Sequence, residues 1–422
     1  MGNILLKGVR IEDRRADIHI VGKRISRIAP SGTIAERDAD KVIDCKRLAA
    51  IPGFVNLHTH ASMTLMRGVS EDAPLKEWLD RVWRIEAFLD HDSIYWGTKL
   101  AILEMLKTGT TSYLDMYWMA DQSVRAAEEM GIRACLTYNF LDNFDSSIAE
   151  KQRRDCQLLH DFSKTWSNRV RFGVSVHADY TTSEDTIRWA KNFANDNGCI
   201  YTAHLGETAS ETEDDLKKYG MTPTEHFDRI EALDSDTILA HALWLTEKDI
   251  DILSKRGVTV VHNINSNLKL ASGYRFQYNE LRDAGVNVCL GTDGTASSNN
   301  LDIREAMKTM ALVQKAWRKD PKAMPLDELM AVATSNGARA LKLDTGRLEE
   351  GALADIVLVN TSSEAFVPNF NFISNLVYSA NSSCFDTVII DGRIVMEGRK
   401  VPGEEEILEK AEELAWKLFK MN

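Results

Sequence analysis

The chain has 422 residues, enough at ~150 residues per domain for two or three domains, or for one large barrel with an accessory domain. Its 51 Lys and Arg residues against 63 Asp and Glu residues leave a formal net charge of −12, and 44% hydrophobic residues suffice for a large core. The composition excludes a peptide without a core. The negative charge, with no block of Lys or Arg, argues against nucleic acid or an anionic membrane as partner.

The distribution of apolar residues bears on where the protein works. No uninterrupted apolar run approaches the ~18 residues that cross a bilayer, and the segment Met1–Lys7 is too short and too soon charged for a signal peptide. The six cysteines are far apart in the chain, contain no Cys-x-x-Cys pair, and several lie in apolar, strand-like runs. We therefore expect a cytoplasmic protein with no membrane contact and with buried free thiols.

The amino-terminal residues 1–49 have the alternating pattern of short β-strands. Ile4–Ile11 and Asp17–Gly22 both alternate apolar and polar residues and end near turn-forming residues. The segment is too small to bury a core by itself, so we expect it to pack against another part of the chain.

Residues 50–346 alternate short apolar runs with longer amphipathic segments, the pattern of repeated strand–helix units around a parallel sheet. The predicted strands are Ala50–His60, Thr111–Tyr117, Arg133–Asn139, Val170–Ala178, Cys199–Glu207, Thr237–Leu245, Thr259–Asn265 and Val286–Gly294. Eight such units predict a closed (β/α)8 TIM barrel, and hence an α/β fold.

The carboxy-terminal residues 347–422 return to the strand pattern of the amino terminus. Ala354–Val359 and Thr387–Arg393 predict strands, and Glu404–Lys420 predicts a closing helix. We expect residues 1–49 and 347–422 to combine into one small β-sandwich-like domain that is discontinuous in sequence.

In a barrel of this kind, catalytic groups gather at the carboxyl ends of the strands, where the loops converge. The first predicted strand ends with His58 and His60, which lie two residues apart and therefore point to the same side of the strand. Two neutral imidazoles presented together suit a zinc or iron ion. A single pair of this kind is a weak signal, because such pairs also arise by chance.

Other predicted strands also end with histidine or carboxylate residues that could bind a metal or transfer protons. The fifth strand carries His204 and Glu207, the sixth His241, and the eighth Asp293. The chain has ten histidines, and those at or near predicted strand ends are His58, His60, His177, His204, His241 and His262. This clustering favours a functional site over accidental placement.

Several motifs resemble those of the amidohydrolase superfamily, and within it those of the deaminases of S-adenosylhomocysteine, methylthioadenosine and 5'-deoxyadenosine. The likeness runs over nearly the whole chain. The motifs that carry it are Pro52–His60, Met63–Gly68, His204–Thr208, His241, Val261–Leu270 and Gly291–Asn300.

The resemblance implies one metal ion held by His58, His60, His204 and Asp293, with zinc expected first and iron as the alternative. Three imidazoles and one carboxylate leave room for a water, whose pKa such an ion lowers toward ~7. Two-metal members of the superfamily usually carry a carboxylated lysine at the end of the fourth strand. Here Val170–Ala178 contains no lysine, so we expect a single ion.

Deamination of an aminopurine needs a base, an acid and a group that stabilises the oxyanion. Asp293 fits the base, Glu207 the acid that moves protons to the ring nitrogen and the leaving ammonia, and His241 the hydrogen-bond donor. By resemblance, Glu86 accepts hydrogen bonds from the ribose hydroxyls and His177 contacts the purine edge. Without the resemblance, Glu86 would be interpreted as a solvated helix carboxylate and His177 as a hydrogen-bonded strand-end histidine.

One position departs from the family pattern. Relatives that accept homocysteine carry an arginine on the third strand, where this chain has Tyr138. Arg153 and Arg154 follow in the next segment, and whether either reaches the substrate stays open. Because a carboxylate clamp works best with a bidentate guanidinium, the change favours uncharged 5'-substituents, as in methylthioadenosine, 5'-deoxyadenosine or adenosine.

We therefore expect a metal-dependent hydrolase that deaminates the adenine of 5'-modified adenosines, with a small nucleoside as its partner and a homo-oligomeric state. Hydrolysis of another heterocycle, such as guanine or an s-triazine, is the alternative within the same class. A non-catalytic scaffold of the same fold is disfavoured because every ligand and acid–base position is filled.

Overall fold

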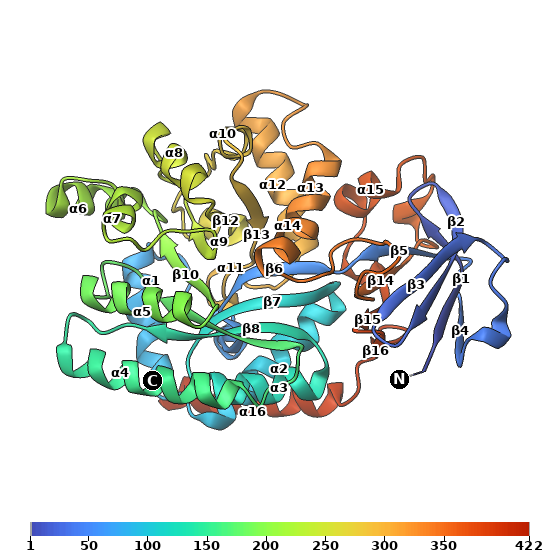
Figure 1. The fold of residues 1–422 in the computed structure, drawn as a ribbon, viewed down its shortest axis with the longest axis horizontal. Helices are drawn as coiled ribbons and strands as arrows, with labels where there is room; N and C mark the ends of the chain where they lie inside the picture. The colour runs from blue at the N-terminus through green and yellow to red at the C-terminus, as the bar shows by residue number, and fades with distance from the viewer. Residues whose placement is uncertain (1, 422) are drawn as a thin grey trace.

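The structure is a computed structural model that describes residues 2–421, and a barrel of parallel strands is its central feature (Figure 1). Eight strands pair in parallel in the order in which they occur in the chain. They are β6 (Phe54–Thr59), β7 (Thr110–Tyr117), β8 (Arg133–Phe140), β9 (Val170–Val176), β10 (Ile200–Leu205), β11 (Thr237–His241), β12 (Thr259–His262) and β13 (Asn287–Leu290). The predicted α/β barrel is confirmed.

The barrel closes between its first and last strands largely through side chains. Asn56 of β6 donates from Nδ2 to the Thr292 hydroxyl at 2.6 Å, and its Oδ1 accepts from the Thr292 backbone N–H at 3.0 Å. The Asp293 backbone N–H donates to the carbonyl of His58 at 3.0 Å. These bonds hold the segment after β13 against the end of β6, which brings Asp293 next to the two histidines of β6.

Helices follow most of the barrel strands and bury their apolar faces against them (Figure 1). They are α1 (Leu75–Glu86), α2 (His91–Lys107), α3 (Ala120–Met130), α4 (Ser146–Ser163), α5 (Glu184–Asp196), α6 (Ala209–Tyr219), α7 (Pro223–Arg229), α8 (Glu247–Arg256), α9 (Ile264–Lys269), α10 (Tyr278–Asp283), α11 (Thr295–Ser298), α12 (Ile303–Arg318), α13 (Leu326–Ala333) and α14 (Ser335–Ala340). Both α7 and α8 begin with a capping box, in which a threonine and an acidic residue three positions later satisfy free backbone N–H groups.

The two ends of the chain form a second, mostly antiparallel sheet beside the barrel, with its own apolar core (Figure 1). Its strands are β1 (Ile4–Ile11), β2 (Arg14–Val21), β3 (Arg24–Pro30), β4 (Lys41–Asp44), β5 (Leu48–Pro52), β14 (Ile356–Asn360), β15 (Phe385–Ile390) and β16 (Arg393–Met396). Its short helices are η1 (Glu36–Asp38), η3 (Glu364–Phe366), α15 (Phe372–Ser374), η4 (Asn375–Ser379) and η5 (Ser382–Cys384). The division of the chain into domains at residues 49/50 and 346/347 stays a prediction.

The first predicted strand, Ala50–His60, is two strands in the structure. Its beginning belongs to β5, which pairs with β1 and β14 of the smaller sheet, and its end is β6 of the barrel. Gly53 separates them, and a Cβ there would lie 2.0 Å from the Thr111 side chain, so only glycine allows this close approach. The chain therefore crosses from one sheet to the other immediately before the residues of the site.

The strands β9 to β13 all end earlier than predicted, and β13, which was expected to reach Gly294, ends at Leu290. The expected strand Thr237–Leu245 ends at His241, because His241 and Ala242 have φ angles of 74° and 48°, outside the extended region. The expected strand Thr259–Asn265 ends at His262 and is followed by α9. Apolar residues in these segments remain buried, which is why their pattern resembles a continuation of the strand.

The last helix, α16 (Glu404–Met421), runs along the barrel (Figure 1), where Ala411 and Leu418 are buried in the same apolar cluster as Trp78 of α1. No helix within residues 2–421 is both long and apolar enough to span a bilayer.

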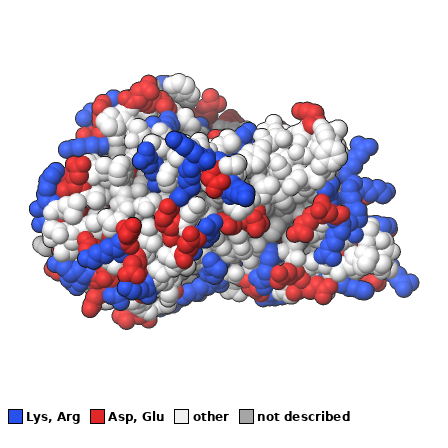
Figure 2. All heavy atoms as spheres, turned by 90° about the horizontal axis from the view of Figure 1, so that it is seen from above, with Lys and Arg blue, Asp and Glu red and all other residues white. Residues whose placement is uncertain are grey.

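The six cysteines are buried and unpaired, as predicted. Basic and acidic side chains are intermingled on the face that Figure 2 shows, so that face has no extended basic surface.

Candidate active site

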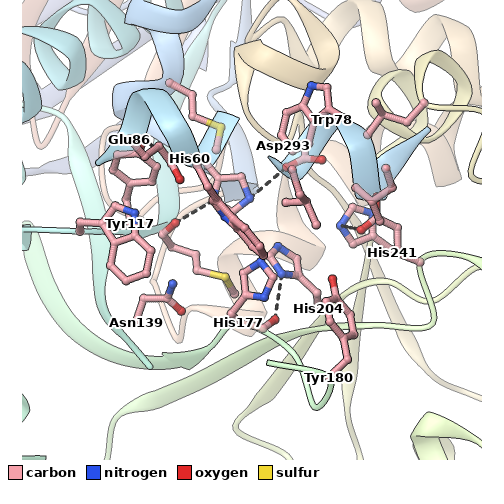
Figure 3. A pocket seen from close by; sticks show the side chains of 18 residues that line it. His60, Trp78, Glu86, Tyr117, Asn139, His177, Tyr180, His204, His241 and Asp293 are labelled. Atoms are coloured by element: carbon pink, nitrogen blue, oxygen red, sulfur yellow. Dashed lines mark hydrogen bonds and ion pairs between the residues drawn. The ribbon is translucent and has the colours of Figure 1, made fainter. Parts of the chain in front are cut away.

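Four metal-ligand side chains meet at the carboxyl end of the barrel. His58 lies in β6 and His60 directly follows it, His204 lies in β10, and Asp293 follows β13. Asp293 Oδ1 lies 3.1 Å from His60 Nε2 and 3.5 Å from His58 Nε2, and His204 Nε2 lies 3.2 Å from His58 Nε2. The structure therefore brings together all four residues to which the resemblance assigns metal binding, and Figure 3 shows three of them, His60, His204 and Asp293.

The hydrogen bonds of the imidazoles decide which nitrogen atoms face the centre of this cluster. His60 Nδ1 donates to the Met116 carbonyl at 2.7 Å, and His204 Nδ1 donates to the His177 carbonyl at 2.9 Å. With the protons on Nδ1, the lone pairs of both Nε2 atoms point inward. Lone pairs of two imidazoles and a carboxylate that converge at this distance repel one another unless a cation lies between them. The residues present fit a divalent metal ion.

The surroundings of His204 and Asp293 favour the protonation states that bind a metal. Burial lowers the pKa of His204 well below its ordinary value, and the surrounding imidazoles lower it further. Burial acts to raise the pKa of Asp293, but the His58 and His60 imidazoles against its carboxyl hold that pKa well below the usual range. A neutral imidazole and an ionised carboxylate are the forms that bind a metal.

Glu207 and His241 lie beside the metal ligands. His241 Nε2 is 3.6 Å from Glu207 Oε2, and both side chains are buried. Burial raises the pKa of Glu207 well above its ordinary value, and the nearby Asp293 carboxylate adds to this effect. Burial lowers the pKa of His241 to about 3. The surroundings of the pair thus favour the protonated form of the Glu207 carboxyl group and the neutral form of the His241 imidazole.

Asn267 controls the tautomer of His241, a role that the sequence analysis did not assign. Its Nδ2 donates to His241 Nδ1 at 2.9 Å, so the imidazole proton is on Nε2, which faces Glu207 and the pocket. Asn267 follows His241 by a whole strand–helix unit, and its short polar side chain gives no sequence signal for this contact.

Glu211 is a second residue that the sequence analysis missed. Its carboxylate accepts the backbone N–H groups of Gly206 at 2.6 Å and Glu207 at 2.8 Å, which holds the turn that presents Glu207. The Thr208 hydroxyl in turn accepts the Glu211 N–H at 3.2 Å. The sequence Thr-x-x-Glu is a typical helix-start signal and could have drawn attention to this residue.

Glu86 and His177, the two residues expected to contact substrate, both line the same pocket as the metal ligands (Figure 3). Glu86 ends α1 and accepts a hydrogen bond from the Tyr117 hydroxyl at 2.7 Å, and burial raises its pKa. His177 follows β9, and its Nδ1 lies 2.9 Å from the Thr181 hydroxyl. Burial lowers the pKa of His177 to about 3, with a further contribution from His60. Glu86 is therefore not a solvated surface carboxylate.

A second cavity of about 570 Å³ adjoins the first and shares Tyr117, Trp118 and Asn139 with it. Lys151 is the one basic residue in its lining; that side chain is 75% exposed and lies 3.9 Å from Asp155, which also lines the cavity. Tyr138, where the resemblance leads one to expect an arginine in relatives that accept homocysteine, also lines this cavity.

Neither arginine of the following helix reaches the two cavities. Arg153 lies over the Trp189 ring with its Nη2 at 3.5 Å from the Thr186 hydroxyl, and the exposed Arg154 lies 3.9 Å from Glu150. Within residues 2–421, no arginine lines either cavity.

Comparison with known proteins agrees with this geometry. A model of the amidohydrolase family matches residues 49–395. The chain is 44% identical over 384 residues to a protein of Thermococcus sibiricus named 5-methylthioadenosine/S-adenosylhomocysteine deaminase, an alignment that covers 90% of each chain. It is 41% identical over 388 residues to a 5'-deoxyadenosine deaminase of Methanoregula boonei, covering 91% of this chain and 87% of the relative.

The fold is also similar to a crystal structure of an adenosine deaminase from Xanthomonas campestris with bound zinc. The TM-score is 0.92 at 30% sequence identity, and the match covers 99% of this chain and 98% of the other. The chain belongs to the amidohydrolase family.

Proposed function

We propose that the protein is a hydrolytic deaminase that converts the adenine of 5'-modified adenosines to hypoxanthine and releases ammonia. The observation that carries the proposal is the buried pair of Glu207 and His241 beside the metal-ligand cluster. A carboxyl group that keeps its proton and a neutral imidazole are the acid and the hydrogen-bond donor that attack of water on an aminopurine requires. The relatives named as deaminases of such nucleosides support the same reaction.

The proposed ligands of one ion are His58, His60, His204 and Asp293. Zinc is the first choice, supported by the zinc in the related adenosine deaminase, and iron is the alternative. When bound, the ion supplies a water activated as nucleophile at neutral pH. The described residues contribute the remaining chemistry.

Each acid–base residue has one task in this proposal. Asp293 accepts the proton of the attacking water through its carboxylate. Glu207 donates its proton to the ring nitrogen beside the attacked carbon. Its carboxylate then takes the hydroxyl proton of the adduct and transfers it to the departing amino group, and the proton that Asp293 removed from the water restores the acid form of Glu207. His241 donates from Nε2 to the oxygen that adds to the ring, because Asn267 occupies its Nδ1. The sum of these steps is addition of water and loss of ammonia.

The substrate-binding roles of Glu86 and His177 are part of the same proposal. A partly buried carboxylate at the end of α1 can accept hydrogen bonds from both ribose hydroxyls, whose desolvation would otherwise cost free energy. His177 lies in the same pocket with a neutral imidazole, which can hydrogen-bond to a purine nitrogen.

We propose that uncharged 5'-substituents are preferred. The cavity that adjoins the site is lined by Tyr138, Trp118 and Met119, and its one cation, Lys151, has Asp155 as a counter-charge. An amino-acid carboxylate placed there would lack a bidentate partner.

The proposal further includes that the protein forms a homo-oligomer and works in the cytoplasm. Size-exclusion chromatography would check the first statement and cell fractionation the second.

The test is ammonia release, followed together with the absorbance change from adenine to hypoxanthine. The substrates are adenosine, methylthioadenosine, 5'-deoxyadenosine, S-adenosylhomocysteine, guanine and an s-triazine, each with zinc supplied. We expect turnover of the adenosines, fastest with uncharged 5'-groups. Turnover of guanine or the triazine alone would overturn the proposal, and preference for S-adenosylhomocysteine would overturn the assignment of the 5'-pocket.

A further inference from the structure

A second group of buried metal-ligand side chains lies outside the residues used above. Asp179 follows β9, Asp215 lies in α6, and His226 lies in α7, two helices that are neighbours in the outer layer (Figure 1). His226 Nδ1 is 3.1 Å from Asp179 Oδ2 and 3.9 Å from Asp215 Oδ2. The side chains of Asp179, Asp215 and His226 are 1%, 7% and 0% exposed.

The carboxylates of this group have oxygen atoms without a partner. Asp179 Oδ1 and Asp215 Oδ2 are buried and accept no hydrogen bond from any group within residues 2–421. Neither carboxylate forms an ion pair with a lysine or arginine of the described chain. Buried carboxylates are normally paired or bound to a metal, because an uncompensated buried charge is costly.

A neighbouring carboxylate sets the orientation of His226. Glu184, at the start of α5, lies 3.1 Å from His226 Nε2, and Arg229 donates to the same carboxylate at 2.6 Å. Glu184 is thus already charge-paired and lies against Nε2, so the other ring nitrogen, Nδ1, faces the two aspartates, 3.1 Å from Asp179 Oδ2. A carboxylate that orients a histidine in this way is characteristic of metal-binding histidines.

The geometry is similar to that of the catalytic cluster in the same molecule. There, His60 Nε2 and Asp293 Oδ1 are 3.1 Å apart, and His58 Nε2 and Asp293 Oδ1 are 3.5 Å apart. An ion at ~2.1 Å from each of two ligand atoms can join atoms separated by up to roughly 4.2 Å. The distances around His226 fall within this span.

From these observations we propose that Asp179, Asp215 and His226 form a second divalent-cation site. Two carboxylate oxygens and one imidazole nitrogen suit zinc or another first-row transition ion better than calcium or magnesium. The ion would join the end of β9 to α6 and α7. Because Glu211 lies one helical turn before Asp215 on α6, the site would also stabilise the segment that holds Glu207.

The test is the number of zinc ions per full-length chain, measured by mass spectrometry after zinc loading and gel filtration. We expect two ions in the wild type, one in Asp215→Asn, one in Asp293→Ala, and none in the double variant. Asp214→Asn is the matched control, because Asp214 is the exposed neighbour on the same helix, and it should keep two ions. His226→Gln should repeat the loss seen in Asp215→Asn.

The ion that remains in Asp215→Asn also reports that the barrel has folded. A single ion in the wild type that Asp293→Ala removes would overturn the proposal, and so would two ions in both Asp215→Asn and His226→Gln. Either result would mean that His226 is a protonated imidazolium that forms ion pairs with the two aspartates. The count of ions does not depend on which nucleoside is the substrate, so it can fail or succeed independently of the proposed function.

Discussion

Glu207 is the side chain whose protonation has the most direct chemical consequence. Burial and the neighbouring Asp293 raise its pKa well above the ordinary value, which favours the acid form that the proposed step uses. Since the proposed step uses this proton, kcat/KM should fall as the pH rises through the pKa of Glu207, and this fall should lie at higher pH than an ordinary glutamate would give. The alkaline limb of a pH–rate profile measures this.

Replacing Glu207 by glutamine tests the same residue. Glutamine still forms a hydrogen bond but cannot transfer a proton, so we expect turnover to fall by about 10²- to 10⁴-fold. The zinc content should stay unchanged, and the exposed Glu213→Gln should behave as the wild type. Zinc loss in Glu207→Gln would identify Glu207 as a ligand and contradict the acid role.

Tyr138 is the residue at which substrate choice can be tested. An arginine there would offer a bidentate partner to a 5'-carboxylate, and one charged hydrogen bond contributes ~1.5–3 kcal/mol. We expect Tyr138→Arg to raise the ratio of kcat/KM for S-adenosylhomocysteine to that for methylthioadenosine by about 10-fold or more. Tyr138→Phe, which keeps the ring without a charge, should leave the ratio near the wild-type value. An unchanged ratio in Tyr138→Arg would place the 5'-group elsewhere.

At the scale of elements, the turn between β10 and α6 presents Glu207 to the pocket. Two backbone N–H groups of this turn, those of Gly206 and Glu207, donate to the Glu211 carboxylate. Gly206 has a φ of 58°, which glycine adopts without strain, and this places Glu207 beyond the end of the strand. The position of the proposed acid thus depends on the start of α6 as well as on the strand.

Glu211→Ala should therefore act on catalysis rather than on substrate binding. Loss of the carboxylate leaves two buried N–H groups without an acceptor, and a displacement of Glu207 by ~1 Å can reduce the rate by about 100-fold. We expect kcat to fall while KM changes little, as steady-state kinetics would measure. Glu213→Ala, an exposed change on the same helix, is the control. A rise in KM at constant kcat would show that Glu211 does not position Glu207.

At the scale of the whole molecule, a buried ion-pair network connects the barrel to the smaller sheet. Arg133, the first residue of β8, donates to Asp355 at 2.7 and 3.1 Å and to Asp391 at 2.7 Å. Asp355 precedes β14 and Asp391 follows β15. The network lies at the amino end of a barrel strand, opposite the site, where residues usually serve stability.

Arg133→Met should destabilise the protein strongly, because it leaves two buried carboxylates without their shared cation. Breaking a buried pair in this way costs about 3–5 kcal/mol. The exposed Arg154, paired at i,i+4 with Glu150, is the comparison, and Arg154→Met should cost less than about 1 kcal/mol. Urea denaturation of both variants gives the free energies of unfolding. Equal losses would contradict a role for the network in joining the two sheets.

The barrel and most of the residues at its site could be predicted from local patterns in the chain. Apolar strands that alternate with amphipathic helices predicted the parallel barrel, because their periodicity is a local property of the chain. The histidines and carboxylates at strand ends predicted which side chains could meet there, since parallel strands present their carboxyl ends at one edge. The buried free cysteines followed from their apolar surroundings and their spacing.

Only the tertiary structure decided the contacts between segments far apart in the chain. The hydrogen bond from Asn267 to His241, and the convergence of Asp179 with His226, depend on how separate units pack, which no local pattern encodes. The ends of β9 to β13 were placed too far along the chain, because buried loop residues continue the pattern of the strand residues. The orientation of Arg153 away from the pocket is likewise a result of packing, here against Trp189, and not of its position in the sequence.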